Sequence, residues 1–141
     1  MKVLFVCTGN TCRSPMAQFL AEDEAKKRGI EGEFRSAGIY ALPGDPMSRA
    51  AVRALEKLMG RTVSHGALPM SKELFDAADL VVGMTEDHRS MLERQYGKSD
   101  KLIAMPESVG DPYGGSETIY LDSARRIREG IAGLMDKGII R

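Results

Sequence analysis

The fold follows from one stretch near the start of the chain, Lys2-Val3-Leu4-Phe5-Val6-Cys7-Thr8-Gly9-Asn10-Thr11-Cys12-Arg13-Ser14-Pro15. Its first part, Lys2–Val6, is a short apolar run rich in β-formers, which is typical of a buried parallel strand. Ser14-Pro15 predicts the start of a helix, because serine is a good N-cap and proline at the first helical position loses no hydrogen bond. The sequence therefore predicts a strand–loop–helix unit with Cys7 where the strand ends.

The rest of the chain alternates between the same two kinds of element. Further strands are predicted at Phe34–Ala37, Leu80–Met84 and Leu102–Met105. The first helix should end at Gly29, and further helices are predicted from Asp45-Pro46 to Gly60, after a Thr85 cap, and from near Ser116. Alternating β and α elements predict an α/β fold, a three-layer sandwich with a doubly wound, four-stranded parallel sheet. With no repeat or linker in the chain, we expect residues 1–141 to form a single domain.

Composition excludes several classes of protein. The 20 basic and 20 acidic side chains balance, so we expect no general attraction to nucleic acid or to an acidic membrane surface. Two cysteines are too few for the disulfide framework of a secreted protein. No apolar run approaches the ~20 residues of a membrane helix. We therefore expect a cytoplasmic protein with neither nucleic-acid nor membrane partners.

The loop after the first strand is suited to bind a phosphate. Parallel sheets bind ligands at the carboxyl ends of their strands, which is where this loop lies. Gly9 and Asn10 can adopt left-handed conformations that turn N–H groups inward, and the following helix N-terminus adds to this anion site. Arg13 would close the site with a planar, two-pronged contact to the phosphate. This positive field favours the thiolate of Cys7, which Ser14 can stabilise with a hydrogen bond. A thiolate beneath a phosphate predicts nucleophilic attack on phosphorus.

Two longer segments without predicted secondary structure, 38–44 and 106–115, are interpreted as functional loops. The second contains Asp111-Pro112-Tyr113-Gly114-Gly115. An aspartate fixed by a following proline at the same end of the sheet suits a general acid and, later in the reaction, a base. Such proton transfer accelerates a reaction by about 10²–10⁴-fold.

Several short motifs now occur together in one chain. They are Cys7 through Ser14 followed by Pro15-Met16-Ala17, Ser36-Ala37-Gly38, Ser64-His65, and Asp111-Pro112-Tyr113. In this combination the chain resembles the low-molecular-weight protein tyrosine phosphatases over nearly its whole length. The resemblance implies a cysteinyl-phosphate mechanism with Cys7 as nucleophile, Arg13 as phosphate clamp and Asp111 as acid and base.

The same resemblance implies further features of the site. The phosphate would be bound by the loop residues Thr8, Gly9, Asn10, Thr11, Cys12, Arg13 and Ser14. A polar network of Asn10, Ser36 and His65 would hold that loop in shape. The reaction would need no metal and no other cofactor, and we expect a monomer.

Two positions depart from the pattern of the members that act on tyrosine. Those members usually carry Ile or Leu at the position of Thr11 and a second aromatic residue at the position of Gly114. This chain resembles instead a bacterial subgroup that removes phosphate from phosphoarginine in proteins, whose loop reads Cys-Thr-Gly-Asn-Thr-Cys-Arg-Ser and whose acid loop reads Asp-Pro-(Phe or Tyr)-Gly-Gly-Ser. The implied function is a protein-arginine phosphatase whose partners are arginine-phosphorylated proteins. In this reading the carboxylate of Asp111 could also pair with the substrate guanidinium.

Three other functions are alternatives. A protein-tyrosine phosphatase of the same family differs only in the pocket for the leaving group. Arsenate reduction on this scaffold normally requires further thiols, and there are none after Cys12. A phosphate-binding or redox-sensing module without activity should lack Cys7, Arg13 or Asp111, and all three are present.

The remaining candidate residues have plainer interpretations. Cys12 is either loop filler or a resolving partner for an oxidised Cys7. His65 is interpreted as a structural hydrogen-bonding residue and His88 as a surface residue in the first turn of a helix, since no paired spacing indicates a metal site. The nine methionines are expected to fill the core. A solvated helix face is expected at Arg125, Arg126 and Arg128.

Overall fold

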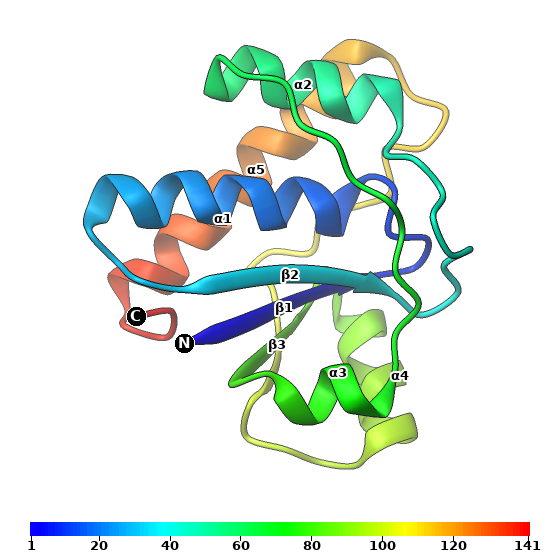
Figure 1. Cartoon of the computed structure of the whole chain (residues 1–141), viewed down its shortest axis with the longest axis vertical. Helices are drawn as coiled ribbons and strands as arrows, with labels where there is room; N and C mark the ends of the chain where they lie inside the picture. The colour runs from blue at the N-terminus through cyan, green and yellow to red at the C-terminus, as the bar shows by residue number, and fades with distance from the viewer.

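The structure, a computed structural model, describes residues 1–141. They fold into three layers, with one sheet between two layers of helices (Figure 1). The four strands are β1 (Lys2–Cys7), β2 (Glu33–Gly38), β3 (Leu80–Gly83) and β4 (Leu102–Ala104). They lie in the order β2-β1-β3-β4, and every neighbouring pair is parallel. The predicted four-stranded parallel sheet is therefore confirmed.

Helices cover both faces of the sheet. α1 (Arg13–Arg28), α2 (Arg49–Met59) and α5 (Glu117–Asp136) lie on one face, and α3 (Lys72–Ala77) and α4 (Glu86–Tyr96) lie on the other (Figure 1). This arrangement confirms the doubly wound, three-layer prediction. None of the helices combines the length and the hydrophobicity that crossing a lipid bilayer requires.

β1 is buried on both faces, which explains its continuous apolar sequence. Val3 and Phe5 belong to the larger apolar cluster, under α1, α2 and α5, whereas Leu4 and Val6 belong to the smaller one, under α3 and α4. Full burial of such a side chain stabilises the fold by about 1.5–3 kcal/mol. Cys7, the last residue of β1, is thus placed by a strand that is buried from Val3 onward.

α1 begins earlier than the sequence predicts, and α2 begins later. α1 begins at Arg13 with Cys12 as its N-cap residue and no capping side chain, so the predicted Ser14 cap is wrong. The Ser14 hydroxyl faces Cys7 instead, and Pro15 is tolerated because the first four N–H groups of a helix need no partner within it. α2 begins at Arg49, not after Pro46, and its cap is Ser48.

The segment from 60 to 71 crosses the end of β2, and the sequence did not predict this path. Pro46 pairs with Gly66 in an isolated antiparallel bridge, and Gly38 pairs with Pro69 in a parallel one. These contacts hold Pro46 in extended backbone, so α2 begins only at Arg49. The short helix α3, capped by Ser71, follows and was also missed.

The two expectations about side chains hold in part, since Met1 is exposed and Met59, Met70, Met91 and Arg128 are only partly buried. Buried methionines contribute to the core at Met16, Met47, Met84, Met105 and Met135. Arg125 and Arg126 are exposed on α5, and Arg126 pairs with Asp122 at 3.1 Å.

Candidate active site

Asn10 holds the loop between β1 and α1 in a left-handed turn. Its φ of 57° makes it the one non-glycine residue with positive φ. The side chain is fully buried, and Nδ2 donates to Ser14 Oγ at 2.7 Å. Oδ1 accepts from the N–H of Leu68 at 2.9 Å and lies 3.0 Å from Nε2 of His65. These bonds stabilise a conformation that would otherwise be strained.

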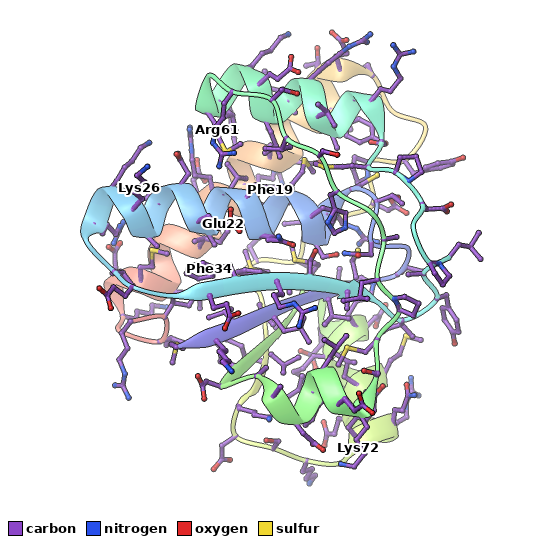
Figure 2. The ribbon with its side chains drawn as sticks, in the orientation of Figure 1. Phe19, Glu22, Lys26, Phe34, Arg61 and Lys72 are labelled. Carbon is purple, nitrogen blue, oxygen red and sulfur yellow. The ribbon has the colours of Figure 1, made fainter.

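His65 has the structural role that the sequence predicts. Besides its contact with Asn10, its ring meets that of Phe19 edge-on with 6.3 Å between centroids. Phe19 is labelled on α1 in Figure 2. Burial lowers the pKa of His65, although the hydrogen bond with Asn10 acts in the opposite direction. A neutral imidazole therefore joins the crossing segment to the loop.

Ser36 does not belong to this network, so that part of the prediction is wrong. Its hydroxyl donates to Gln18 Oε1 at 2.7 Å on α1. The side chain that completes the network with Asn10 and His65 is Ser14, because Asn10 reaches it directly.

Cys7 lies at the end of β1 with its sulfur against a hydroxyl. The residue is buried, and Sγ is 2.9 Å from Ser14 Oγ. Ser14 Oγ accepts from Asn10 at 2.7 Å, and of the two acceptors within reach of its proton, Sγ at 2.9 Å is nearer than the carbonyl oxygen of Ala37 at 3.4 Å. A thiolate, an acceptor without a proton of its own, fits this arrangement.

Arg13 brings a buried guanidinium to the same place. Nη1 donates to the carbonyl of Val109 at 3.2 Å, and Nη2 lies 3.8 Å from Asp111 Oδ2. A guanidinium has five N–H donors, so most of them remain for a bound anion. Asp111 is 57% exposed, and its Oδ1 accepts from the N–H of Tyr113 at 3.0 Å, which fixes the carboxylate at the edge of the site.

The predicted site residues surround one cavity of about 200 Å³. It is lined by Cys7, Thr8, Gly9, Asn10, Thr11, Cys12, Arg13, Asp111 and Tyr113. Ser14 is the one predicted loop residue outside this lining, and it lies behind Cys7. Tyr113 is 81% exposed at the edge of the cavity. Residues separated by about a hundred positions thus meet at the carboxyl end of the sheet, as the sequence predicts.

His88 is not a surface residue, contrary to the sequence-based interpretation. It is only 5% exposed, and its Nε2 lies 2.9 Å from Thr8 Oγ1 in the loop. Nδ1 lies 2.9 Å from Oγ1 of Thr85, the N-cap residue of α4. Burial, and next the charge of Arg13, lowers the pKa of His88 to about 4. No pattern within the sequence indicates this contact, because the two partners are 80 positions apart.

Cys12 lies in a polar cluster behind the loop. Its Sγ is 3.5 Å from the hydroxyl of Tyr120 and 3.6 Å from Ser48 Oγ. Burial, and next the hydrogen bond with Cys12, raises the pKa of Tyr120 to about 12. Cys7 and Cys12 are both free thiols.

Comparison with known proteins agrees with this geometry. Residues 2–139 match the family model described as low molecular weight phosphotyrosine protein phosphatase. A protein-arginine-phosphatase of Bacillus subtilis (strain 168) is 39% identical over 138 residues, which cover 92% of this chain and 91% of that protein. The low molecular weight protein-tyrosine-phosphatase PtpB of Staphylococcus haemolyticus is 34% identical over 127 residues, covering 85% and 87%.

A solved structure of a related protein has nearly the same fold. It is described as the arginine phosphatase YwlE, a mutant in which a serine replaces a cysteine and the active-site serine is phosphorylated. The TM-score is 0.91 at 34% identity, and the match covers 97% of this chain and 95% of that one.

Proposed function

The chain belongs to the low molecular weight phosphotyrosine protein phosphatase family, and from that premise we propose that it hydrolyses phosphoarginine in proteins through a cysteinyl-phosphate on Cys7. The chain is a phosphatase, and its substrates are phosphorylated proteins. The specificity for arginine is supported by the two protein-arginine-phosphatases among its relatives, at 39% and 33% identity. We place the enzyme and its substrates in the cytoplasm.

In the first step the Cys7 thiolate attacks phosphorus. An S–P bond forms as the P–N bond breaks, and Asp111 gives its proton to the departing guanidine nitrogen. The loop N–H groups and Arg13 bind the three phosphoryl oxygens. These oxygens carry the negative charge of the transition state, which the contacts stabilise. The phosphorylated active-site serine of the YwlE mutant supports a covalent intermediate on Cys7, at the end of β1.

In the second step water attacks the phosphorus of the intermediate. Asp111, now a carboxylate, takes a proton from that water, and the S–P bond breaks to release phosphate. The departing thiolate of Cys7 accepts the proton of Ser14 Oγ in a hydrogen bond, at the 2.9 Å seen in the structure. Stabilising this leaving group lowers the barrier to hydrolysis.

One observation carries the choice of arginine: both Thr11 and Asp111 line the cavity in front of Cys7. A guanidinium brings several N–H donors, and each one left unpaired after water is excluded costs about 1–3 kcal/mol. A threonine hydroxyl and a carboxylate supply acceptors that an aliphatic pocket lacks. A flat phenol ring needs none of them.

A phosphotyrosine phosphatase is the second candidate, because a curated relative of that description is 34% identical and a solved structure of that description, from T. tengcongensis, is 38% identical. The test is turnover of two peptides of matched sequence that differ only in carrying phosphoarginine or phosphotyrosine. We expect kcat/KM to be higher for phosphoarginine. A higher value for phosphotyrosine would assign the enzyme to the second candidate.

Cys7→Ser tests the intermediate in the same assay. The variant should turn over less than about 1% as fast as the wild type, because serine is a far weaker nucleophile than a thiolate. Mass spectrometry after acid quenching should find the phosphoryl group on residue 7 in both proteins. Activity above that level in a pure sample of the variant would argue against a covalent route.

A further inference from the structure

Thr8 differs from the other loop residues in its exposure. Cys7, Asn10, Cys12 and Arg13 are buried, whereas Thr8 is exposed and lines the same cavity. Thr8 therefore lies nearer the mouth of the cavity than its buried neighbours do. The mouth is where the group attached to phosphorus has to lie.

A buried histidine fixes the Thr8 hydroxyl from behind. Nδ1 lies 2.9 Å from Oγ1 of Thr85, which also accepts from the backbone N–H of His88 at 3.2 Å, and Nε2 lies 2.9 Å from Oγ1 of Thr8. In the tautomer with its proton on Nε2, the ring donates to Thr8, and in the other tautomer Thr8 donates to the ring. A hydroxyl oxygen has two lone pairs, so Thr8 keeps at least one lone pair for a ligand.

A neutral ring suits this position because the site already contains a cation. The charged groups that act on His88 are Arg13, Asp87 and Asp111. Its pKa near 4 leaves the ring uncharged at neutral pH. A lysine or arginine in its place would repel a substrate guanidinium, whereas a neutral imidazole supplies the hydrogen bond without the charge.

Building on the proposed function, we propose that the Thr8 hydroxyl accepts a hydrogen bond from the guanidinium of phosphoarginine, and that His88 is the positioning residue that holds it there. Thr8 would then be a third acceptor at the mouth of the cavity, beside Thr11 and Asp111. Sites built on hydrogen bonds discriminate strongly against ligands that lack the partner groups. Thr8 and His88 therefore contribute to the preference for phosphoarginine over phosphotyrosine.

Two pairs of variants separate the hydrogen bond from side-chain shape. Thr8→Val removes the hydroxyl at almost equal volume, and Thr8→Ser keeps it. His88→Gln can place an amide nitrogen near the position of Nε2, so it can still donate to Thr8. His88→Asn reaches only the position of Nδ1 and leaves Thr8 without its hydrogen-bond partner.

The measurements are kcat/KM on the matched phosphoarginine and phosphotyrosine peptides and inhibition by inorganic phosphate. On phosphoarginine we expect Thr8→Val to lose about tenfold and His88→Asn about fivefold, with Thr8→Ser and His88→Gln within about twofold of the wild type. Turnover of phosphotyrosine and inhibition by phosphate should change much less than turnover of phosphoarginine, because the substitutions leave the loop N–H groups and Arg13 in place. The Thr8→Val/His88→Asn double variant should be no worse than Thr8→Val, since both act through one hydroxyl.

Urea unfolding establishes that each variant is folded at the assay temperature. An unchanged ratio of phosphoarginine to phosphotyrosine turnover in folded Thr8→Val would overturn the proposal, as would additive losses in the double variant. A loss of phosphate inhibition in Thr8→Val as large as the loss on phosphoarginine would also overturn it, because the hydroxyl would then bind the phosphoryl group. Failure of the proposed function looks different: the wild type itself would prefer phosphotyrosine.

Discussion

At the scale of single residues, Thr11 is the position on which substrate choice depends most directly. It lines the cavity, and the chain carries a hydroxyl there at nearly aliphatic volume. Thr11→Ile should lower kcat/KM on a phosphoarginine peptide by about tenfold or more, which is ~1.4 kcal/mol in the transition state. Turnover of the matched phosphotyrosine peptide should hold or rise, because an aliphatic wall favours a flat ring. An unchanged ratio between the two peptides would contradict the assignment to arginine.

A substitution of Asp111 tests whether this single residue transfers the proton to the leaving group. Asp111→Asn keeps the size of the side chain and removes the proton that the leaving group needs. The variant should slow the phosphoarginine peptide by about 10²–10⁴ and p-nitrophenyl phosphate much less, because nitrophenolate departs without a proton. The comparison is kcat on the two substrates at one pH. Equal slowing of both would mean that Asp111 only positions Arg13.

The sequence predicts residues of this site when chemistry and spacing coincide locally. Cys7 and Arg13 are recognisable because the nucleophile and the clamp occupy one short loop after a buried strand. Asp111 is recognisable because a proline and glycines surround it. His88 is not, since its partner Thr8 belongs to a different element and only the packing of α4 on the sheet brings them together. The prediction for Ser36 was wrong for a similar reason: its hydroxyl donates to Gln18 on α1 and not to the network of Asn10 and His65.

At the scale of elements, the starts of helices were only partly predictable: α4 and α5 begin after Thr85 and Ser116 as the sequence predicts, whereas α1 and α2 do not begin as predicted. Ser14-Pro15 and Asp45-Pro46 both have the local pattern of a helix start, yet neither begins a helix at the predicted residue. In the first case Cys7 uses the hydroxyl that would have capped the helix. In the second case the segment around Gly66 pairs with the chain at Pro46 and keeps it extended. Tertiary contacts outweigh a capping preference of about 1 kcal/mol in both places.

The junction between β2 and the phosphate loop gives a prediction at this scale. A Cβ on Gly38 would lie 2.6 Å from the carbonyl of Thr8 and 2.9 Å from the backbone nitrogen of Asn10. Gly38→Ala should therefore cost about 1–3 kcal/mol of stability in urea unfolding and lower kcat on p-nitrophenyl phosphate by at least about tenfold.

Gly133→Ala is the matched control for this experiment. Gly133 lies within α5, and a Cβ there would meet nothing within 4 Å. The substitution should raise stability by about 0.5–1 kcal/mol, because alanine loses less backbone entropy in a helix, and it should leave kcat unchanged. If Gly38→Ala behaved like this control, the close approach of β2 to the loop would not matter for catalysis.

At the scale of the whole molecule, the alternation of apolar strands and amphipathic helices was sufficient to predict the layers and the parallel sheet. Both faces of β1 are buried, so its sequence carries no alternation to misread. The segment from 60 to 71 was not predictable, because its bonds to Gly38 and Pro46 are long-range backbone contacts that no periodicity records. Those contacts nevertheless deliver His65 to Asn10, so the site depends on them.

The buried neutral state of His88 also makes the stability of the whole chain depend on pH. Its pKa is about 4 in the folded protein against an ordinary value near 6.5, so between these values the unfolded chain binds a proton that the folded one does not. Stability from this group is therefore complete above pH 6.5 and is lost as the pH falls toward 4. Between pH 7 and pH 5 the loss should be about 2 kcal/mol.

His88→Gln isolates this contribution, because glutamine cannot titrate and can still donate to Thr8. The free energy of unfolding in urea should be measured at pH 7 and pH 5 for both proteins. The carboxylates and His65 titrate alike in the two, so their contributions cancel in the comparison. The wild type should lose about 2 kcal/mol more than the variant on acidification. An equal loss in both would mean that His88 takes up a proton in the folded protein, and a charged ring would then lie beside Arg13, where a second cation is unfavourable.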